Sequence, residues 1–507
     1  MKPFLLFERY DDQSREEILP GDSMVEDLNL DYIFKAMSQG DTYLYHTAKS
    51  VVLDSITDIN TIIYRQDILK DCINNNFIIK ELYNVASEAI EEAECYIQYN
   101  KPNYARMISV SVKVFNAVGL LELLAAKLQK LRSAITLANY EFQSKGMNEF
   151  CRQTETFLTD EFFKRVTQHI TDLKSTEGSK IIIGSRLGMG MKSCGQVLRN
   201  ISKPSSKNNS PKHFFKTLEQ NVIYLDNTSI INSAREIEDA GLVHILRLIN
   251  HFNEVIMDFF NTLHYECGFY VGALNLYYKV KQLNPQISFP VPEEIDRRDL
   301  IFEELFDLSL LINENITPVS NNLYAVSKSL YIITGANQGG KSTFLRSVGI
   351  AQLMMQCGLF VPAAYYSANI CDNIFTHFTR EEDVKMNSGK LDEELLRMNN
   401  IINSLTPNSM LLMNEPFATT TERDGSKIAS DIVTALFESN VKILFVTHLF
   451  EFADFMYSKN IEMAMFLRAE RNENGSRSFC IKQGKPLHTS YGEDLYNNVI
   501  QDDQEFE

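Results

Sequence analysis

One stretch of nine residues, Gly-Ala-Asn-Gln-Gly-Gly-Lys-Ser-Thr at 335–343, constrains the fold more than any other part of the sequence. It fits the pattern G-x-x-x-x-G-K-[ST] of a phosphate-binding loop. The apolar run 330–334 predicts a buried strand before it, and apolar residues at helical spacing over 344–351 predict a helix after it. Because a phosphate loop requires these flanks, they support the match. The stretch predicts an α/β domain with a nucleoside triphosphate site.

The residue types in this loop suit a triphosphate. Glycines let backbone N–H groups close around the phosphates, and the start of the helix adds the positive end of its dipole. Lys341 is expected to reach the outer phosphates, and the Ser342 hydroxyl to bind Mg²⁺. A chance glycine turn between a strand and a helix is the alternative interpretation. The predicted ATP-binding residues of the loop are Gly335, Ala336, Asn337, Gln338, Gly339, Gly340, Lys341, Ser342 and Thr343.

A second apolar strand, about seventy residues after the loop, ends in polar residues. The run 410–413 is followed by Asn414 and Glu415, which is the form of a Walker B strand. In that motif the first carboxylate holds Mg²⁺ and the second polarises the attacking water. Asn414 replaces the usual aspartate, and its amide oxygen brings no negative charge. We therefore predict Ser342, Asn414 and Glu415 as the metal site, Glu415 as the catalytic base, and weak turnover.

A third strand, predicted to begin at Val441, ends in Thr447 and His448. A histidine at this place could sense the γ-phosphate or position a water molecule by hydrogen bonding. A single histidine at a strand end is more often structural, which is the alternative. Together with the lysine and the glutamate it completes the predicted catalytic set, Lys341, Glu415 and His448.

The chain before the loop is predicted to be mainly helical. Residues 1–58 form a predicted N-terminal lead-in, and residues 59–283 form a predicted helical domain. The segments 78–99 and 103–143 place apolar residues at i, i+3 and i+4, which is typical of long helices that pack on one another.

A small β insertion is predicted at about 176–230 inside this helical domain, at the tip of two long antiparallel helices. Residues 284–507 alternate predicted strands and helices, which indicates an α/β domain around the phosphate loop. The predicted fold is therefore a multidomain α and α/β chain.

The charge distribution is uneven. The chain has a net charge of −17, which argues against a protein that covers nucleic acid with its whole surface. From 178 to 218, however, there are eight Lys or Arg residues and no Asp or Glu. A solvated loop without a partner is one interpretation of this segment. Contact with DNA phosphates is the other, and its predicted DNA-binding residues are Lys192, Arg199, Lys203, Lys207 and Lys212.

Other classes of protein fit the composition less well. No run of 18 apolar residues predicts a membrane helix, and residues 1–8 have too short an apolar core for a signal peptide. Eight scattered cysteines without a C-x-x-C pair indicate neither a disulfide framework nor a zinc site. A cytoplasmic protein without a membrane partner is expected.

Several motifs in order resemble the ATPase of the MutS family of DNA mismatch-repair proteins. In that resemblance Phe375 would pack on adenine. Ser388 would belong to the signature loop that reaches the ATP of a partner subunit. A weaker similarity at 63–69 extends to the core segment of the family. The matching segments are 334–343, 358–363, 372–376, 388–389, 447–451 and 490–492.

The resemblance implies a homodimer that sandwiches two ATP molecules with Mg²⁺ between ABC-type P-loop ATPase domains. The long helices and the β insertion would be the family's core, lever and clamp, which grip double-stranded DNA. With about 60 residues before the core segment, we expect no mismatch-recognition or connector domain. Lys390 and the residues after it depart from the family's signature loop.

Two function classes remain open. The first is an ATPase that switches a DNA clamp in repair or recombination. The second is a scaffold that binds ATP, hydrolyses it weakly because of Asn414, and binds a protein partner. A transporter ATPase is disfavoured because the sequence has no Leu-Ser-Gly-Gly signature, and a chromosome-condensing relative would need much longer coiled coils.

Overall fold

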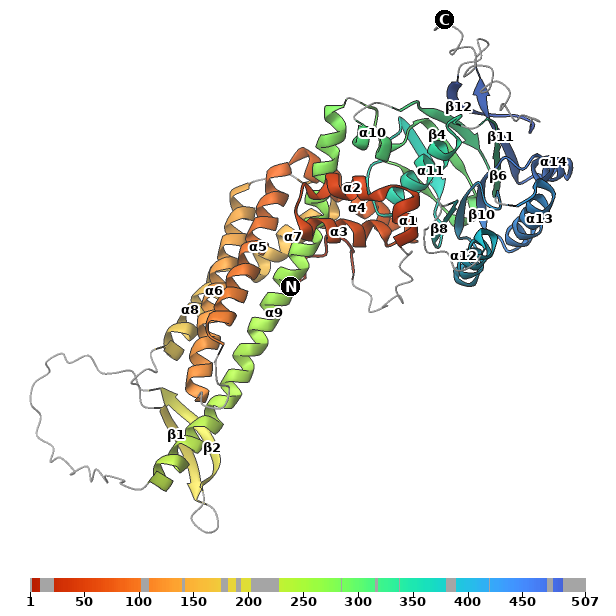
Figure 1. Cartoon of the computed structure of the whole chain (residues 1–507). Coiled ribbons are helices and arrows are strands. Elements are labelled where there is room, and N and C mark those ends of the chain that lie inside the picture. The colour runs from red at the N-terminus through yellow and green to blue at the C-terminus, as the bar shows by residue number, and fades with distance from the viewer. Residues whose placement is uncertain are drawn as a thin grey trace, which may run out of the picture. The chain divides into compact units, whose positions relative to one another are not determined.

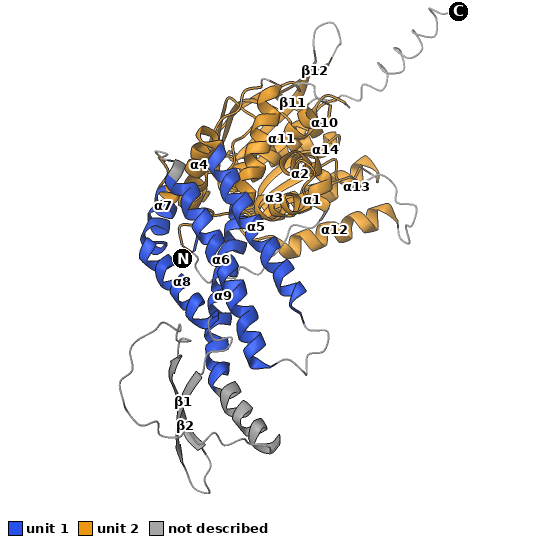
Figure 2. Ribbon diagram, turned by 90° about the vertical axis from the view of Figure 1, so that its left-hand side faces the viewer, with its two compact units in different colours: residues 1–3, 77–141, 148–267 blue, residues 4–76, 142–147, 268–507 orange. Residues whose placement is uncertain are grey.

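The computed structural model shows a chain of mixed helical and α/β architecture, which confirms the predicted fold class at this level (Figure 1). Its two compact units are interleaved along the chain (Figure 2). The structure describes residues 2–9, 22–101, 109–138, 142–174, 181–187, 193–201, 228–283, 285–314, 318–336, 338–379, 389–418, 420–471 and 477–486. Within these ranges, the side chains of 22, 137–138, 181–187, 193–201, 228–240 and 471 are not described.

Unit 1 comprises residues 1–3, 77–141 and 148–267 and is mainly helical. Long helices dominate because their apolar residues recur at helical spacing, as in the buried series Ile78, Leu82, Val85 and Ala89 of α5. The elements that lie wholly or largely in unit 1 are α5 (Asn76–Tyr99), α6 (Val110–Ala138), α7 (Lys145–Phe157), α8 (Asp160–Lys174), β1 (Ile181–Leu187), β2 (Ser193–Ile201) and α9 (Thr228–Gln282).

Helices α6, α8 and α9 share a hydrophobic cluster that includes Val118, Ile170 and Ile249. The buried side-chain amide nitrogen of Asn253 on α9 donates to the carbonyl oxygen of Ala117 (2.9 Å), which links α9 to α6 inside the cluster. Helices α5 and α6 approach closely at Gly119, where a Cβ atom would overlap the Tyr96 hydroxyl.

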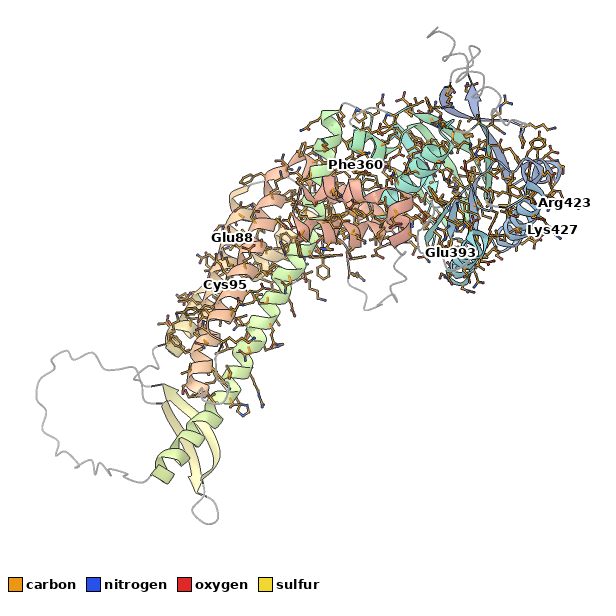
Figure 3. All side chains as sticks on the ribbon, in the orientation of Figure 1. Glu88, Cys95, Phe360, Glu393, Arg423 and Lys427 are labelled. Carbon is orange, nitrogen blue, oxygen red and sulfur yellow. The ribbon has the colours of Figure 1, made fainter. Side chains whose placement is uncertain are left out.

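Charged pairs lie on the surface of the same helices. Lys127 of α6 contacts Glu88 (3.1 Å) and Glu92 (2.6 Å) of α5, and Lys130 contacts Glu88 (2.7 Å). Figure 3 labels Glu88 on α5. Because Glu88 and Glu92 are about half exposed, such pairs contribute only about 0–1 kcal/mol each. These pairs therefore add little to the apolar packing of α6, α8 and α9.

Strands β1 and β2 form an antiparallel pair, with Ile181 opposite Ile201 and two irregularities in the register. This pair lies in the predicted β insertion. The strand predicted over 221–225 lies outside the described residues. The lever and clamp roles of the helices and of this hairpin stay predictions.

Unit 2 comprises residues 4–76, 142–147 and 268–507. Its N-terminal helices are α1 (Asp22–Asp27), α2 (Leu30–Ser38), α3 (Thr42–Leu53) and α4 (Ile59–Asn74). These helices belong to the same compact unit as the phosphate loop. Arg65 on α4 is 1% exposed and donates to the carbonyl oxygens of Leu6 (2.9 Å) and Cys357 (3.4 Å). The predicted domain limits themselves stay predictions.

Two sheets make up the described α/β part of unit 2. One has the order β12-β11-β6-β10-β9-β8, and the other has the order β3-β7-β4-β5. The strands are β3 (Val291–Glu293), β4 (Leu300–Leu305), β5 (Asn321–Ala325), β6 (Leu330–Thr334), β7 (Tyr365–Asn369), β8 (Ile374–Phe378), β9 (Met410–Asn414), β10 (Lys442–Val446), β11 (Ala464–Arg471) and β12 (Arg477–Gln483).

The first sheet is parallel from β11 through β8, and β12 pairs antiparallel at its edge. Strands β6 and β10 are buried along their whole length, as expected for parallel strands covered on both faces. The helical elements of this part are η2 (Ile295–Arg297), α10 (Leu308–Glu314), α11 (Lys341–Gln356), α12 (Lys390–Ser404), α13 (Glu422–Glu438) and α14 (Phe450–Ser458).

One hydrophobic cluster packs the sheet against helices. It contains Leu411 and Phe445 from the strands, Met398 from α12, Val433 from α13 and Phe452 from α14. None of the helices in the described residues has the length and apolar character that crossing a membrane requires.

Candidate nucleotide-binding site

Three parallel strands end at the same edge of the larger sheet. Val446 of β10 lies opposite both Ile333 of β6 and Asn414 of β9. The residues that follow these strands are therefore brought together, although more than one hundred residues separate the first from the last. They are the phosphate loop after β6, Glu415 after β9, and His448 two residues after β10.

The backbone of the phosphate loop adopts conformations that favour glycine. Gly335 has φ 127° and Gly340 has φ 88°. A Cβ atom at Gly335 would lie 2.9 Å from the Cβ of Ala469 on β11, so a side chain does not fit. Gly340 is the residue before α11, whose first residue is Lys341. The loop thus passes into a helix of 16 residues whose first N–H groups are available to an anion.

The Lys341 side chain is folded into the loop. It is 3% exposed, and its Nζ donates to the carbonyl oxygens of Gly335 (2.8 Å) and Ala336 (2.9 Å). The same Nζ lies 3.4 Å from Nε2 of His448 and 3.9 Å from Oε1 of Glu415. Burial lowers the pKa of the ammonium to about 8, although the negative charge of Glu415 opposes this shift.

Ser342 and Asn414 are directly bonded. The Ser342 hydroxyl donates to the side-chain oxygen of Asn414 at 2.8 Å. Hydroxyl, amide and carboxylate oxygens are ligands that suit Mg²⁺, so the three predicted metal ligands fit this ion in donor type. Among the described residues, no three His, Cys, Asp or Glu side chains gather to hold a metal ion by themselves.

Glu415 and His448 form the second contact of the site. His448 Nε2 lies 2.7 Å from Glu415 Oε1, and about a third of each side chain is exposed. The bond with His448 lowers the pKa of Glu415, burial opposes the shift, and the nearby lysine charge supports it. The carboxylate is therefore ionised at neutral pH and can accept a proton.

Glu415 has a strained backbone. Its φ of 53° lies in the left-handed region, which costs a residue other than glycine about 1–3 kcal/mol. Two hydrogen bonds hold it there. Its N–H donates to the carbonyl oxygen of Val446 (2.8 Å), and the Thr379 hydroxyl donates to its carbonyl oxygen (2.7 Å). Sequence reasoning missed Thr379, although its place directly after β8, the strand next to β9, is a signal that could have found it.

The hairpin of β11 and β12 also borders the loop. Arg477 on β12 donates to the Gln338 side chain, and a Cβ atom at Gly340 would lie 3.2 Å from the carbonyl oxygen of Phe479. No sequence motif predicts these two contacts, because they depend on how the edge strands β11 and β12 pair. Thr343, the third residue of α11, has a described position, whereas Asn337 lies outside the described residues.

Among the remaining predicted site residues, Phe375 is the one whose side chain is described. Phe375 lies on edge strand β8, with β9 and β10 between it and β6, and it packs partly buried against the hydrophobic cluster of the sheet. Its role toward adenine stays a prediction. For Arg199, on β2, only the backbone is described. The predicted residues outside the described ranges are Ser388, Lys192, Lys203, Lys207 and Lys212.

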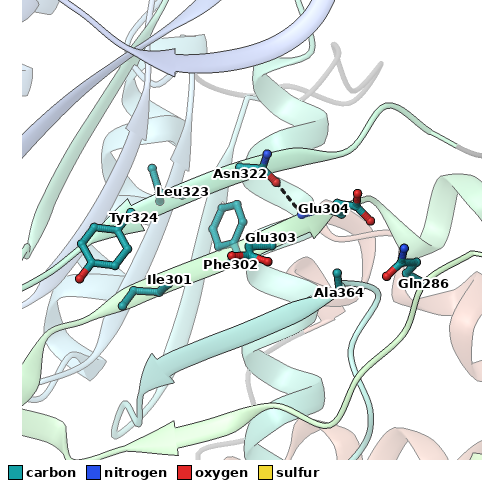
Figure 4. Close-up of a pocket in the computed structure, with 9 residues that line it drawn as sticks. All are labelled: Gln286, Ile301, Phe302, Glu303, Glu304, Asn322, Leu323, Tyr324 and Ala364. Atoms are coloured by element: carbon teal, nitrogen blue, oxygen red, sulfur yellow. Dashed lines mark hydrogen bonds between the residues drawn. The ribbon is translucent and has the colours of Figure 1, made fainter.

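A separate cavity of about 590 Å³ lies on the smaller sheet, beside Tyr324 and Glu303 (Figure 4). The side-chain oxygen of Asn322 accepts from the backbone N–H of Glu304 at 2.7 Å, and both residues line the cavity. None of the predicted site residues with a described side chain lines this cavity. The convergence of the three strand ends, rather than this cavity, marks the candidate site.

Comparisons with known proteins agree with the geometry. The model of the MutS2 N-terminal domain matches residues 57–283, and the model of MutS domain V matches residues 331–497. The chain is 27% identical over 246 residues to the DNA mismatch repair protein MutS of Thermodesulfovibrio yellowstonii, covering 48% of this chain and 29% of that protein.

Eukaryotic relatives match a shorter part. The MutS protein homolog 4 of Homo sapiens is 32% identical over 164 residues, which cover 32% of this chain and 17% of the relative. The DNA mismatch repair protein MSH3 of Arabidopsis thaliana is 28% identical over 190 residues, which cover 36% of this chain and 18% of the relative. In each of these three comparisons the chain spans less than a third of the relative's length.

Proposed function

The chain belongs to the MutS family, and we propose that it is an ATPase that binds double-stranded DNA as a nucleotide-switched homodimer in DNA repair or recombination. The observation that carries the proposal is the convergence of Lys341, Glu415 and His448 within 4 Å of one another at a phosphate loop. The relatives named as DNA mismatch repair proteins support the DNA part.

The side chains have distinct roles in the proposed hydrolysis of ATP to ADP and phosphate. Lys341 would exchange its two backbone carbonyl partners for phosphate oxygens, which are stronger acceptors because they are charged. Glu415 would accept the proton of the attacking water. The Nε2 atom of His448 lies within hydrogen-bond distance of Glu415 Oε1. His448 would therefore orient the Glu415 carboxylate and sense the γ-phosphate.

Ser342, Asn414 and Glu415 would hold Mg²⁺. When bound, the ion neutralises negative charge on the phosphates. In the homodimer, the segment around Ser388 of one subunit would reach the nucleotide of the other, as the family resemblance implies. Nucleotide binding would then change how the helical unit of each subunit meets the duplex, a rigid-body switch driven by γ-phosphate contacts.

The alternative function is an ATP-binding scaffold that hydrolyses weakly and binds a protein partner. Asn414 is the observation that favours it. Replacing Asn414 by aspartate adds a negative charge next to Ser342, so we expect turnover at limiting Mg²⁺ to rise about tenfold. Steady-state phosphate release across a Mg²⁺ titration measures this, with Asn414→Ala as the control that removes the bond without adding charge. No gain at any Mg²⁺ concentration would contradict metal retention as the limiting factor.

ATP affinity is expected to depend on pH through Lys341. The pKa of this buried lysine is lowered to about 8 in the free protein, and bound phosphates would raise it because they favour the charged form. Affinity is therefore constant below about pH 8 and falls by up to about tenfold per pH unit above it. Calorimetric titration of ATP at about pH 7 and about pH 9 checks this sign. Equal affinities would show that the charge of Lys341 is not used.

Duplex-DNA binding without nucleotide, with ADP, and with ATP plus Mg²⁺ tests the proposed function, with phosphate release read in the same samples. Nucleotide-dependent binding with turnover supports the ATPase clamp. ATP binding without turnover or a DNA effect would support the scaffold.

A charge-removal variant locates the DNA contact. The triple variant Lys203→Ala, Lys207→Ala and Lys212→Ala should reduce the slope of log affinity against log salt by about three. A matched triple variant at the exposed lysines Lys35, Lys459 and Lys482 should leave it unchanged.

A further inference from the structure

We propose that Glu394 is a positioning residue for Glu415 and acts through the backbone N–H of Phe417. The inference rests on the proposed function, in which Glu415 is the catalytic base. It adds a residue that touches neither nucleotide nor metal ion. The sequence around Glu394 contains no motif that would select it, because two other acidic residues, Asp392 and Glu393, lie beside it on the same helix.

Glu394 is a buried carboxylate on α12. It is 4% exposed, and its Oε1 accepts a hydrogen bond from the N–H of Phe417 at 2.8 Å. His377 on β8, 1% exposed, places Nε2 at 3.5 Å from the same oxygen. Burial raises the pKa of Glu394, but the interactions with His377 and Phe417 outweigh it, so the pKa lies below its usual value. The group is therefore a buried acceptor that binds the backbone just after Glu415.

The backbone at this place needs outside support. Glu415 and Phe417 both have left-handed φ angles, 53° and 62°, on either side of Pro416. Residues other than glycine keep such angles only when their surroundings hold them. Thr379 holds the carbonyl group of Glu415 at 2.7 Å on one side of the turn, and Glu394 holds the N–H of Phe417 on the other.

Phe417 and Gly425 restrict the same turn further. The Phe417 ring is fully buried, with its centroid 6.2 Å from that of the His377 ring. A Cβ atom at Gly425 would lie 2.9 Å from the Phe417 carbonyl oxygen, so this close approach needs glycine. With the ring fixed, the remaining freedom of the turn lies in the peptide groups between Glu415 and Phe417, and the bond to Glu394 restrains the last of them.

Core stability alone does not account for a carboxylate here. Removing a carboxylate from water is costly, and an apolar side chain of similar volume is often as stabilising or more so. Met398, one helical turn further along α12, is such an apolar residue and is 1% exposed. The backbone bond at the turn distinguishes Glu394 from its neighbour.

Three single variants test the proposal in the full chain. Glu394→Met keeps the volume but removes the acceptor, and we expect kcat for ATP hydrolysis to fall about 10- to 100-fold, because small displacements of a catalytic group have effects of this size. The dissociation constant of ATP should stay within about twofold, since Lys341 and the loop are untouched. Glu394→Gln keeps an oxygen that can accept from the same N–H and should retain kcat within about threefold. Met398→Ala, the control, should lower the melting temperature while kcat stays within about twofold.

A double variant gives an independent readout. If Glu394 acts only through Glu415, adding Glu394→Met to Glu415→Gln should not lower kcat further. Unchanged kcat in Glu394→Met would overturn the inference, as would a Glu394→Gln variant as slow as Glu394→Met. Loss of ATP binding in step with kcat would also overturn it. A wild-type protein without turnover would overturn the proposed function together with this inference, whereas normal wild-type turnover with an active Glu394→Met variant removes the inference alone.

Discussion

Replacing Lys341 by alanine is expected to weaken ATP binding and to lower ATP hydrolysis by about 10²- to 10³-fold, the usual effect of losing a preorganised group that stabilises developing charge. The side chain is buried in the loop, and its ammonium is bound by two carbonyl oxygens that compete weakly with phosphate. No other described Lys or Arg donates to these two carbonyl oxygens. Arginine should not restore activity, because its planar fork does not fit a site built around one compact ammonium.

A second buried lysine provides a matched control for this variant. Lys442 on β10 is fully buried, and burial lowers its pKa to about 8, as it does for Lys341. Its Nζ donates to the carbonyl oxygen of Asp299 (3.1 Å) and to Asn369 (2.6 Å), away from the phosphate loop. Lys442→Met should therefore lower the melting temperature and leave ATP affinity unchanged. Equal loss of ATP binding in both variants would show that Lys341→Ala acts by unfolding the domain.

The parts of the site that the sequence predicts share one physical cause. A buried apolar strand that ends in polar residues is recognisable locally, and the carboxyl ends of parallel strands meet at one edge. Lys341, Ser342, Asn414, Glu415 and His448 all follow from these two facts, and the structure brings them together.

Residues outside these motifs could not be predicted in this way. Glu394 acts from a helix, and Phe479 approaches the loop from an edge strand, so their places depend on tertiary packing rather than on local pattern. The N-terminal helices are a similar case. Their apolar faces predict that these helices are buried but not which elements they pack against. In the structure α1 belongs to unit 2, and Leu28, the residue after α1, lies close to Gly349 of α11.

The adenine role of Phe375 stays a prediction, and the sheet order sets what it requires. The segment 372–376 resembles a family motif, yet the residue lies on the edge strand farthest from β12 and packs against the hydrophobic cluster. A motif gives the position of a residue in the sequence. The order of the strands in the sheet determines which groups the side chain of that residue can contact. The distance from β6 to β8 is three strand spacings, about 14 Å, which an adenine contact for Phe375 would have to span.

Replacing Glu415 by glutamine is the second change with a large expected effect, and it should separate hydrolysis from binding. Glutamine keeps the shape of the side chain and can still bond His448, but it cannot accept a proton from water. We expect turnover to fall about 10²- to 10⁴-fold, the range that general-base catalysis contributes. ATP affinity should be unchanged or higher, because a negative charge 3.9 Å from Lys341, the residue proposed to bind the phosphates, is removed.

Phosphate release and an ATP titration on the same preparation measure the two effects. His448→Ala is the matched control, since it removes the partner of Glu415 but leaves the base in place, so its loss of turnover should be smaller. Turnover retained in Glu415→Gln would exclude this carboxylate as the base. If the wild type itself releases no phosphate, Glu415→Gln cannot lower the rate, and unchanged ATP binding in all three proteins would then favour the ATP-binding scaffold. A chain that loses ATP binding with Lys341→Ala and loses turnover alone with Glu415→Gln hydrolyses ATP with Glu415 as its base, and the turnover rate of the wild type then separates the ATPase from a weakly hydrolysing scaffold.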